Sequence, residues 1–237
     1  MATAFDDLLE VQAHDTRLDQ LHHQLAHLPE QAARDAAHQA VADVEASLAS
    51  EQSTRDDLGR QQRRLDDEIE TINQKRKSVE ATLYDGSVTN ARELQDLQEE
   101  SGALARRVSQ LEDQDLEIME LIEPIDARLV TLAATREQCV ATLAQAESAL
   151  TVASAELAAA LEAETAIRAE VAARVDGALL AEYDSLRAGN GGVGVSRLVG
   201  SQCGGCHLTL SAVEVAGIRK HPDVATHCEE CGRLLVP

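Results

Sequence analysis

The sequence predicts a mainly α-helical protein, a long antiparallel coiled-coil hairpin followed by a small β-rich zinc ribbon. Apolar residues recur at alternating spacings of three and four over two long stretches, which places them along one side of a helix. A turn sequence separates the stretches, and two pairs of closely spaced cysteines lie near the C-terminus. We therefore expect a helical domain at 1–188, a glycine-rich hinge at 189–195 and a ribbon at 196–237.

The composition supports long helices rather than a large globular core. The 237 residues include one Phe, two Tyr and no Trp, too few aromatic side chains for such a core. The formal net charge of −21 makes extensive wrapping of nucleic acid unfavourable, since phosphates would be repelled. The N-terminus does not resemble a signal peptide, and no apolar run approaches the length of a membrane span. We expect a cytoplasmic protein without a membrane partner.

The first helical segment ends at Leu28 and Pro29. Proline lacks an N–H group and suits the first turn of a helix, so we expect a kink or short break there, with Pro29 opening the next helix. The first arm of the hairpin then extends from Glu30 to Leu83. Its apolar stripe consists of Val41, Val44, Leu48, Leu58, Leu65, Ile69, Ile72, Val79 and Leu83.

The turn of the hairpin is expected at 84–90. Asp85 and Gly86 form a turn dipeptide, because glycine accepts the positive φ that a tight reversal often needs. Asn90 followed by Glu93 has the pattern of a capping box that begins a new helix. Whether these residues only connect two helices or also contact a partner is left open by the sequence.

The second arm keeps the same spacing over a long distance. Its stripe consists of Leu94, Leu97, Leu104, Val108, Leu111, Ile118, Ile122, Ile125, Leu129, Leu132, Cys139, Leu143, Leu150, Leu157, Ile167 and Val171. Polar residues that interrupt such a stripe usually fix register and partner choice; here they are Ser101, Asp115, Arg136, Glu164 and Arg174. Pro124 does not disturb the heptad phase, so we expect it to kink the helix. Self-association of the coil is the alternative to pairing within one chain.

Two Cys-x-x-Cys knuckles, Cys203 with Cys206 and Cys228 with Cys231, predict one zinc ion. A two-residue spacer lets both sulfurs of a knuckle face the same ion, and four thiolates leave no position for water. The ion is therefore expected to be structural. A thioredoxin-like redox pair lacks the required βαβ surroundings, and an iron–sulfur cluster lacks the usual ferredoxin spacings.

The region between the knuckles predicts a small fold that depends on the metal. Ser211 and Glu214 form a capping-box pattern that opens a helix to about Arg219. Short strands are expected at 195–199 and 234–236. So small a module buries little apolar surface, and structural zinc sites typically supply about 10–16 kcal/mol of apparent binding energy.

The chain resembles a bacterial family with an N-terminal antiparallel coiled-coil hairpin and a C-terminal four-cysteine zinc ribbon. The resemblance rests on Leu-Tyr-Asp-Gly-Ser-Val-Thr-Asn-Ala-Arg-Glu-Leu at 83–94, Glu-Tyr-Asp-Ser-Leu-Arg at 182–187 and both knuckles, with Leu28-Pro29. Most members are uncharacterised. Relatives in flagellated bacteria act as adaptors or chaperones that bind an alternative sigma factor and, in one case, a flagellin messenger RNA. The resemblance implies a recognition role without identifying the partner.

Two surfaces are candidates for such a role, and no catalytic constellation is present in the sequence. A protein partner is expected at the turn, where the candidate residues are Lys75, Arg76, Lys77, Tyr84, Asn90 and Arg92. Binding of RNA or DNA through the ribbon is the alternative, with Arg197, Arg219, Lys220 and Arg233 as phosphate contacts. The alternative lacks an aromatic stacking platform and a strong positive charge. We therefore predict a non-enzymatic, zinc-binding adaptor.

Overall fold

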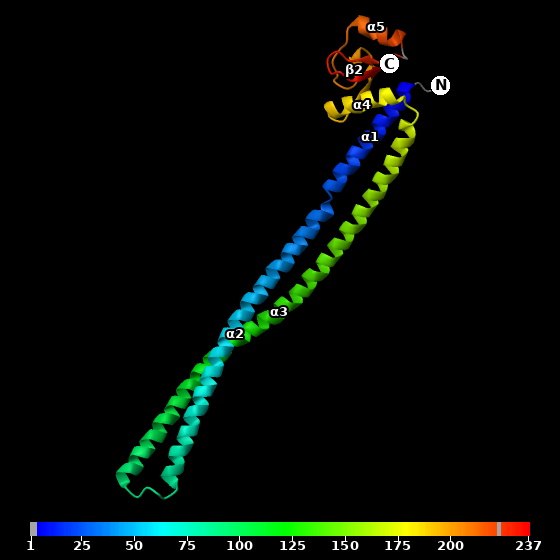
Figure 1. The fold of residues 1–237 in the computed structure, drawn as a ribbon. Coiled ribbons are helices and arrows are strands. Elements are labelled where there is room, and N and C mark those ends of the chain that lie inside the picture. Colours follow the sequence, from blue (N-terminus) through cyan, green and yellow to red (C-terminus); the bar gives the residue numbers. More distant parts are fainter. Residues whose placement is uncertain (1–3, 222–223) are drawn as a thin grey trace. The chain divides into compact units, whose positions relative to one another are not determined.

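The computed structural model describes residues 4–221 and 224–237. The elements follow in the order α1 (Ala4–Ala26), α2 (Pro29–Tyr84), α3 (Ala91–Ala172), α4 (Gly177–Gly189), β1 (Val195–Val199), β2 (Gln202–Cys203), α5 (Ala212–Lys220), β3 (Thr226–His227) and β4 (Leu234–Val236) (Figure 1). The chain divides into two compact units. We call Arg34–Ala146 the hairpin unit, and Met1–Ala33 with Glu147–Pro237 the ribbon unit.

In the hairpin unit, α2 and α3 run antiparallel. Ion pairs between the two helices show this orientation, because residues with higher numbers on α2 pair with residues with lower numbers on α3. The pairs include Glu51 with Arg128 at 3.0 Å, Glu68 with Arg107 at 2.8 Å and Lys75 with Glu100 at 2.8 Å. The predicted apolar stripes face each other, and their best-covered members are Val44, Val108, Leu111, Ile122 and Ile125. The predicted intramolecular hairpin is confirmed.

The two prolines occupy different places in the helices. α1 ends at Ala26 and Pro29 is the first residue of α2, where its missing N–H group breaks no helical hydrogen bond. α3 continues without interruption through Pro124.

The turn of the hairpin is stabilised by short polar side chains. Asp85 accepts a hydrogen bond from the backbone N–H of Ser87 at 2.8 Å, and Gly86 has φ of +78°. The Asn90 side-chain oxygen accepts the N–H of Arg92 at 2.9 Å, which caps the first turn of α3.

In the ribbon unit, α1 lies along the C-terminal part of α3. His14 contacts Glu164 at 2.6 Å, and Arg168 donates to the Asp15 carboxylate at 3.0 Å. The predicted stripe is wrong at one position here, because Ile167 is 44% exposed. Arg168 lies on the side of α3 that faces α1 instead, because its guanidinium pairs with the almost fully covered carboxylate of Asp15.

Four strands form a small sheet in the order β2-β1-β4-β3. β1 and β4 are parallel, and each has an antiparallel neighbour on its other side. The predicted strands at 195–199 and 234–236 are present. The predicted capping box is also present, with Ser211 accepting the N–H of Glu214 and the Glu214 carboxylate accepting the N–H of Ser211.

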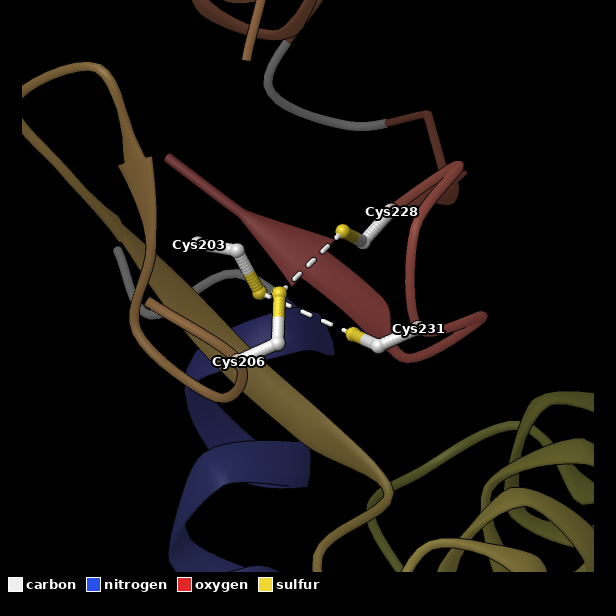
Figure 2. Close-up of side chains that lie close together, drawn as sticks. All are labelled: Cys203, Cys206, Cys228 and Cys231. Atoms are coloured by element: carbon white, nitrogen blue, oxygen red, sulfur yellow. Dashed lines mark hydrogen bonds between the residues drawn. The ribbon is translucent and has the colours of Figure 1, made fainter. Parts of the chain in front are cut away.

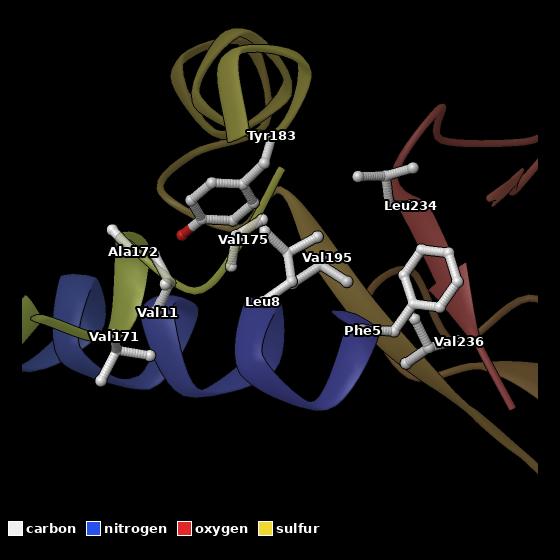
Figure 3. Packing of buried hydrophobic residues seen from close by; sticks show 10 residues of the cluster. All are labelled: Phe5, Leu8, Val11, Val171, Ala172, Val175, Tyr183, Val195, Leu234 and Val236. Carbon is white, nitrogen blue, oxygen red and sulfur yellow. The ribbon is translucent and has the colours of Figure 1, made fainter. Parts of the chain in front are cut away.

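Two apolar clusters flank this sheet. The first joins the sheet to the helices (Figure 3) and contains Phe5, Leu8 and Val11 of α1, Val171 and Ala172 of α3, Val175, Tyr183 of α4, Val195 of β1, and Leu234 and Val236 of β4. The second surrounds the cysteines and includes Leu210, Val215, Ile218 and Leu235.

The glycine-rich segment, for which the sequence predicts a hinge, makes specific contacts in the structure. The Gln12 side chain donates to the carbonyl of Gly192 at 2.9 Å and accepts the N–H of Gly194 at 2.7 Å. The Arg233 guanidinium donates to the carbonyls of Asn190 and Val193 at 2.8 and 3.0 Å. The backbone of this segment is therefore bonded both to α1 and to Arg233, the residue before β4.

Candidate metal centre and binding surfaces

The four predicted cysteine ligands converge on one point. Their sulfur atoms all lie within 4.8 Å of one another. Cys203 and Cys231 are separated by 3.9 Å, and Cys206 and Cys228 by 3.8 Å (Figure 2). A disulfide would bring two sulfurs to about 2.05 Å. Each close pair thus joins one cysteine of the first knuckle to one of the second, as expected around a shared ion.

The backbone of each knuckle forms a tight turn that directs its two sulfur atoms toward the shared site. The N–H of His207 bonds to the carbonyl of Cys203 at 2.8 Å, and the N–H of Gly232 bonds to that of Cys228 at 2.8 Å. A Cβ at position 204 would lie 2.7 Å from the carbonyl oxygen of Arg197, so Gly204 is required for this approach. Gly232 has φ of +74°, which favours glycine.

The surroundings of the cysteines favour the thiolate form of Cys203 and disfavour that of Cys228. Burial raises the pKa of Cys203, but hydrogen bonds from the Ser196 hydroxyl and from backbone N–H groups outweigh it and lower the pKa to about 6. Burial is the largest influence on Cys228 and raises its pKa to about 12. A cation bound between the sulfurs would stabilise the thiolate form of both residues.

The arrangement fits zinc. A tetrahedral ion with Zn–S bonds of about 2.3 Å separates its sulfur ligands by about 3.8 Å, close to the two distances found here. Two of the four cysteines are fully covered and two are partly covered. When bound, zinc would serve as a structural cross-link between the knuckles, because four thiolates complete its coordination. Fold and site thus define a coiled-coil protein with a four-cysteine structural zinc site.

Comparison with known proteins gives the family. Residues 11–191 match the family model described as the CT398-like coiled coil hairpin domain, and residues 202–235 match the C4-type zinc ribbon domain. The chain belongs to this family of coiled-coil hairpin proteins with a C-terminal zinc ribbon. The resemblance inferred from the sequence is confirmed.

Relatives and solved structures extend over nearly the whole chain. An uncharacterized protein of Mycobacterium tuberculosis is 34% identical, with 97% of this chain and 93% of the relative covered. A solved structure from Mycobacterium smegmatis has a TM-score of 0.87 at 27% identity, with 100% of both chains covered. CT398 from Chlamydia trachomatis has a TM-score of 0.72 at 18% identity, with 98% of this chain and 97% of CT398 covered, and shares the fold.

The six turn candidates differ in how far their side chains are engaged. Lys75 is paired with Glu100, Arg76 lies 3.6 Å from Glu80, and the Asn90 oxygen caps α3. Tyr84 is 80% exposed, and Lys77 and Arg92 are exposed as well. Within the described part of the chain, neither Lys77 nor Arg92 forms an ion pair. Three side chains are therefore available at the turn: Lys77, Tyr84 and Arg92.

The four candidate phosphate contacts of the ribbon differ in how far their side chains are engaged by other groups of the chain. Arg197 contacts Asp6 at 3.3 Å, and Arg219 donates to the carbonyl of Gly200 at 2.8 Å. Arg233 is bonded to two backbone carbonyls, as described above. Lys220 is exposed at the last residue of α5.

A buried polar cluster that the sequence analysis missed connects α1, α3 and α4. The Asp15 carboxylate accepts hydrogen bonds from the Tyr183 hydroxyl at 2.7 Å and from Arg168 at 3.0 Å. Burial, and then the bond to Asp15, raise the pKa of Tyr183. The sequence does contain a pattern that indicates burial of Asp15, because this residue follows Leu8 and Val11 at the three-four spacing of the apolar residues in the first helix.

Among the residues that the structure describes, none of the helices combines the length and the apolar character needed to cross a membrane.

Proposed function

We propose that this protein is a non-enzymatic adaptor that recognises a protein partner through the turn of its hairpin. The observation that carries this proposal is the exposure of Tyr84, which is 80% accessible and lies in the sequence between two exposed cations, Lys77 and Arg92. Tyrosine and arginine are, with tryptophan, the residue types enriched at the energetic centres of protein interfaces. A cytoplasmic protein surface with an apolar pocket for Tyr84 and acidic groups for the cations would fit.

The surroundings of the turn also favour a binding role. Neighbouring charges are paired within the hairpin, as with Lys75 and Glu100, whereas Lys77 and Arg92 carry charge in an otherwise acidic chain. Such charges speed encounters with an oppositely charged partner and select against partners of like charge. The closed four-thiolate zinc site offers no open coordination position, which favours a binding function over catalysis.

Site-specific photocrosslinking in the native cell would test this proposal. A photoreactive amino acid at position 84 should crosslink a protein partner, and the same group at position 130 should not, since Val130 is 73% exposed on α3. The double substitution Lys77→Glu and Arg92→Glu should reduce crosslinking at position 84 with helicity by circular dichroism unchanged. Identical crosslinked proteins at both positions would rule out the turn as the recognition site.

Nucleic-acid binding through the ribbon is the less supported alternative. Three of its four candidate cations already contact a carboxylate or backbone carbonyls, and only Lys220 is without such a contact among the described residues. A filter-binding titration of the full chain with RNA and DNA at low and high salt tests it, because phosphate contacts weaken as salt rises. Salt-sensitive binding that Lys220→Glu and Arg219→Glu remove would favour the alternative.

A further inference from the structure

The sheet of the ribbon lies between the two apolar clusters, and strands β1 and β4 contribute side chains to both. In β4, Leu234 and Val236 belong to the cluster with α1 and α4, while Leu235 between them packs beside the cysteines. β1 likewise places Val195 in the first cluster and Leu198 against the second. Successive side chains of a strand point to opposite faces, so neither strand can move without disturbing both clusters.

Arg233 ties the zinc knuckles to the segment that precedes β1. Its guanidinium holds the carbonyls of Asn190 and Val193, and its own carbonyl accepts the N–H of Cys228 at 2.9 Å. Its side chain also lies against the first knuckle, where a Cβ at Gly205 would be 2.7 Å from Cδ of Arg233. One residue thus contacts both knuckles and the glycine-rich segment.

Helix α1 also bonds to this segment. The buried Gln12 amide bonds to the backbone of Gly192 and Gly194. A Cβ at Gly194 would lie 2.7 Å from the carbonyl oxygen of Tyr183, so the segment also packs closely on α4. The contacts of Gln12 and Arg233 join the metal knuckles to the helices through the backbone at 190–194.

We propose that zinc binding controls whether one apolar surface of α1 and α4 is covered. This surface, the docking face, consists of Phe5, Leu8 and Val11 of α1 and Tyr183 of α4, which are at most 7% exposed and share an apolar cluster with Val195 of β1 and with Leu234 and Val236 of β4. With zinc bound, the knuckles hold Arg233 and the two strands in place over the docking face. Without zinc, a parallel pairing of only three residues per strand is too short to persist, and the docking face becomes accessible.

The consequence is a metal-dependent change in surface chemistry that does not involve the hairpin turn. An uncovered group of large apolar side chains is typical of surfaces that bind proteins or self-associate. The proposal does not depend on the function proposed for Tyr84, because all of its residues belong to the ribbon unit.

Hydrogen exchange of the full chain, with zinc bound and after removal by a chelator, tests the proposal directly. Peptides covering 4–12 and 179–187 should exchange at least about tenfold faster without zinc, because their tertiary cover is lost. Peptides covering 100–125 in the hairpin unit should be unchanged. The proposal is overturned if 203–231 loses protection while 4–12 keeps it.

A pair of cysteine variants separates zinc loss from side effects of the chelator. Cys228→Ser removes one metal ligand and should reproduce the faster exchange at 4–12. Cys139→Ser removes a thiol from α3 outside the metal site and should behave as the native chain does. Equal protection at 4–12 in both variants would contradict the proposal.

The coupling must also act in the reverse direction, since linkage between two sites is reciprocal. Leu8→Ala weakens the docking face and should lower zinc affinity about tenfold, measured by competition with a chromophoric chelator. Leu111→Ala makes the same change at an equally buried position of the hairpin unit and should leave zinc affinity unchanged. Native zinc affinity in a folded Leu8→Ala variant would overturn the proposal.

Discussion

The hairpin unit and the ribbon unit are stabilised in different ways. The hairpin unit buries a narrow apolar stripe between two helices and pairs its charges at the exposed edges, as with Arg128 and Glu51. The ribbon unit contains two apolar clusters, a metal site and the Asp15 carboxylate, whose side chain is only 7% exposed. Chemically similar substitutions should therefore lower the free energy of unfolding much more in the ribbon unit than in the hairpin unit.

The largest difference is expected for buried and exposed carboxylates. Asp15→Ala leaves Arg168 and the Tyr183 hydroxyl without their shared partner and should lower the free energy of unfolding by about 3–5 kcal/mol. Asp126→Ala breaks the pair with Arg55, in which both side chains are over a third exposed, and should cost less than about 1 kcal/mol. Urea unfolding of both variants measures the difference. Equal losses would show that the two units do not differ in this respect.

Alkaline pH should destabilise the ribbon unit through Tyr183. Burial and the bond to Asp15 raise its pKa in the folded state, so above pH 10 the tyrosine ionises in the unfolded chain but not in the folded chain. The contribution of this residue is complete below pH 10 and should fall by up to about 1.4 kcal/mol per pH unit above it. Comparing urea unfolding of native protein and Tyr183→Phe at pH 9 and pH 11 isolates the effect. A pH dependence that is identical in both proteins would contradict it.

A smaller effect is expected at the hairpin turn. Gly86→Ala places a Cβ in open space but forces alanine to adopt φ of +78°, which should cost roughly 1–2 kcal/mol. Gly102→Ala makes the same change inside α3, where the higher helix propensity of alanine should stabilise the chain by up to about 1 kcal/mol. Thermal unfolding should give shifts of opposite sign, and shifts of the same sign would argue against a strained turn.

The smallest effect is expected for the exposed pair of Arg128 and Glu51. Two hydrogen bonds of 3.0 Å join these side chains, yet the arginine side chain is 53% exposed. A double-mutant cycle with Arg128→Ala and Glu51→Ala should give a coupling below about 1 kcal/mol that decreases with added salt. A larger coupling that is insensitive to salt would mean that this pair contributes to stability as a buried pair does.

The features that the sequence predicted are those with a local signature. The three-four spacing indicated both arms, Asp85 and Gly86 marked the turn, and two short cysteine motifs defined the zinc ligands. Each depends on residues within one or two helical turns of each other, so the pattern is visible along the chain. Ile167 shows the limit of such a pattern, because its spacing fits the stripe while the pairing of Arg168 with Asp15 places it toward solvent.

The joint between the ribbon and the helices has no such signature. Gln12 and Gly194 are separated by 182 positions, and Asp15 and Tyr183 by 168. A single sequence does not show which distant polar groups will satisfy each other. Glycines at 189–194 favour mobility when considered alone, and only the contacts from Gln12 and Arg233 show that their backbone is held.

The amino-acid sequence alone determined that this protein has two helical arms, a reversal near Gly86 and four thiolates suited to one zinc ion. Only the tertiary structure decided that the zinc ribbon packs on α1 and α4 and that Arg233 belongs to this joint. The physical reason is that periodicity and ligand spacing act over short distances along the chain. The packing of Leu8 with Leu234, by contrast, depends on complementary shapes that only folding brings together.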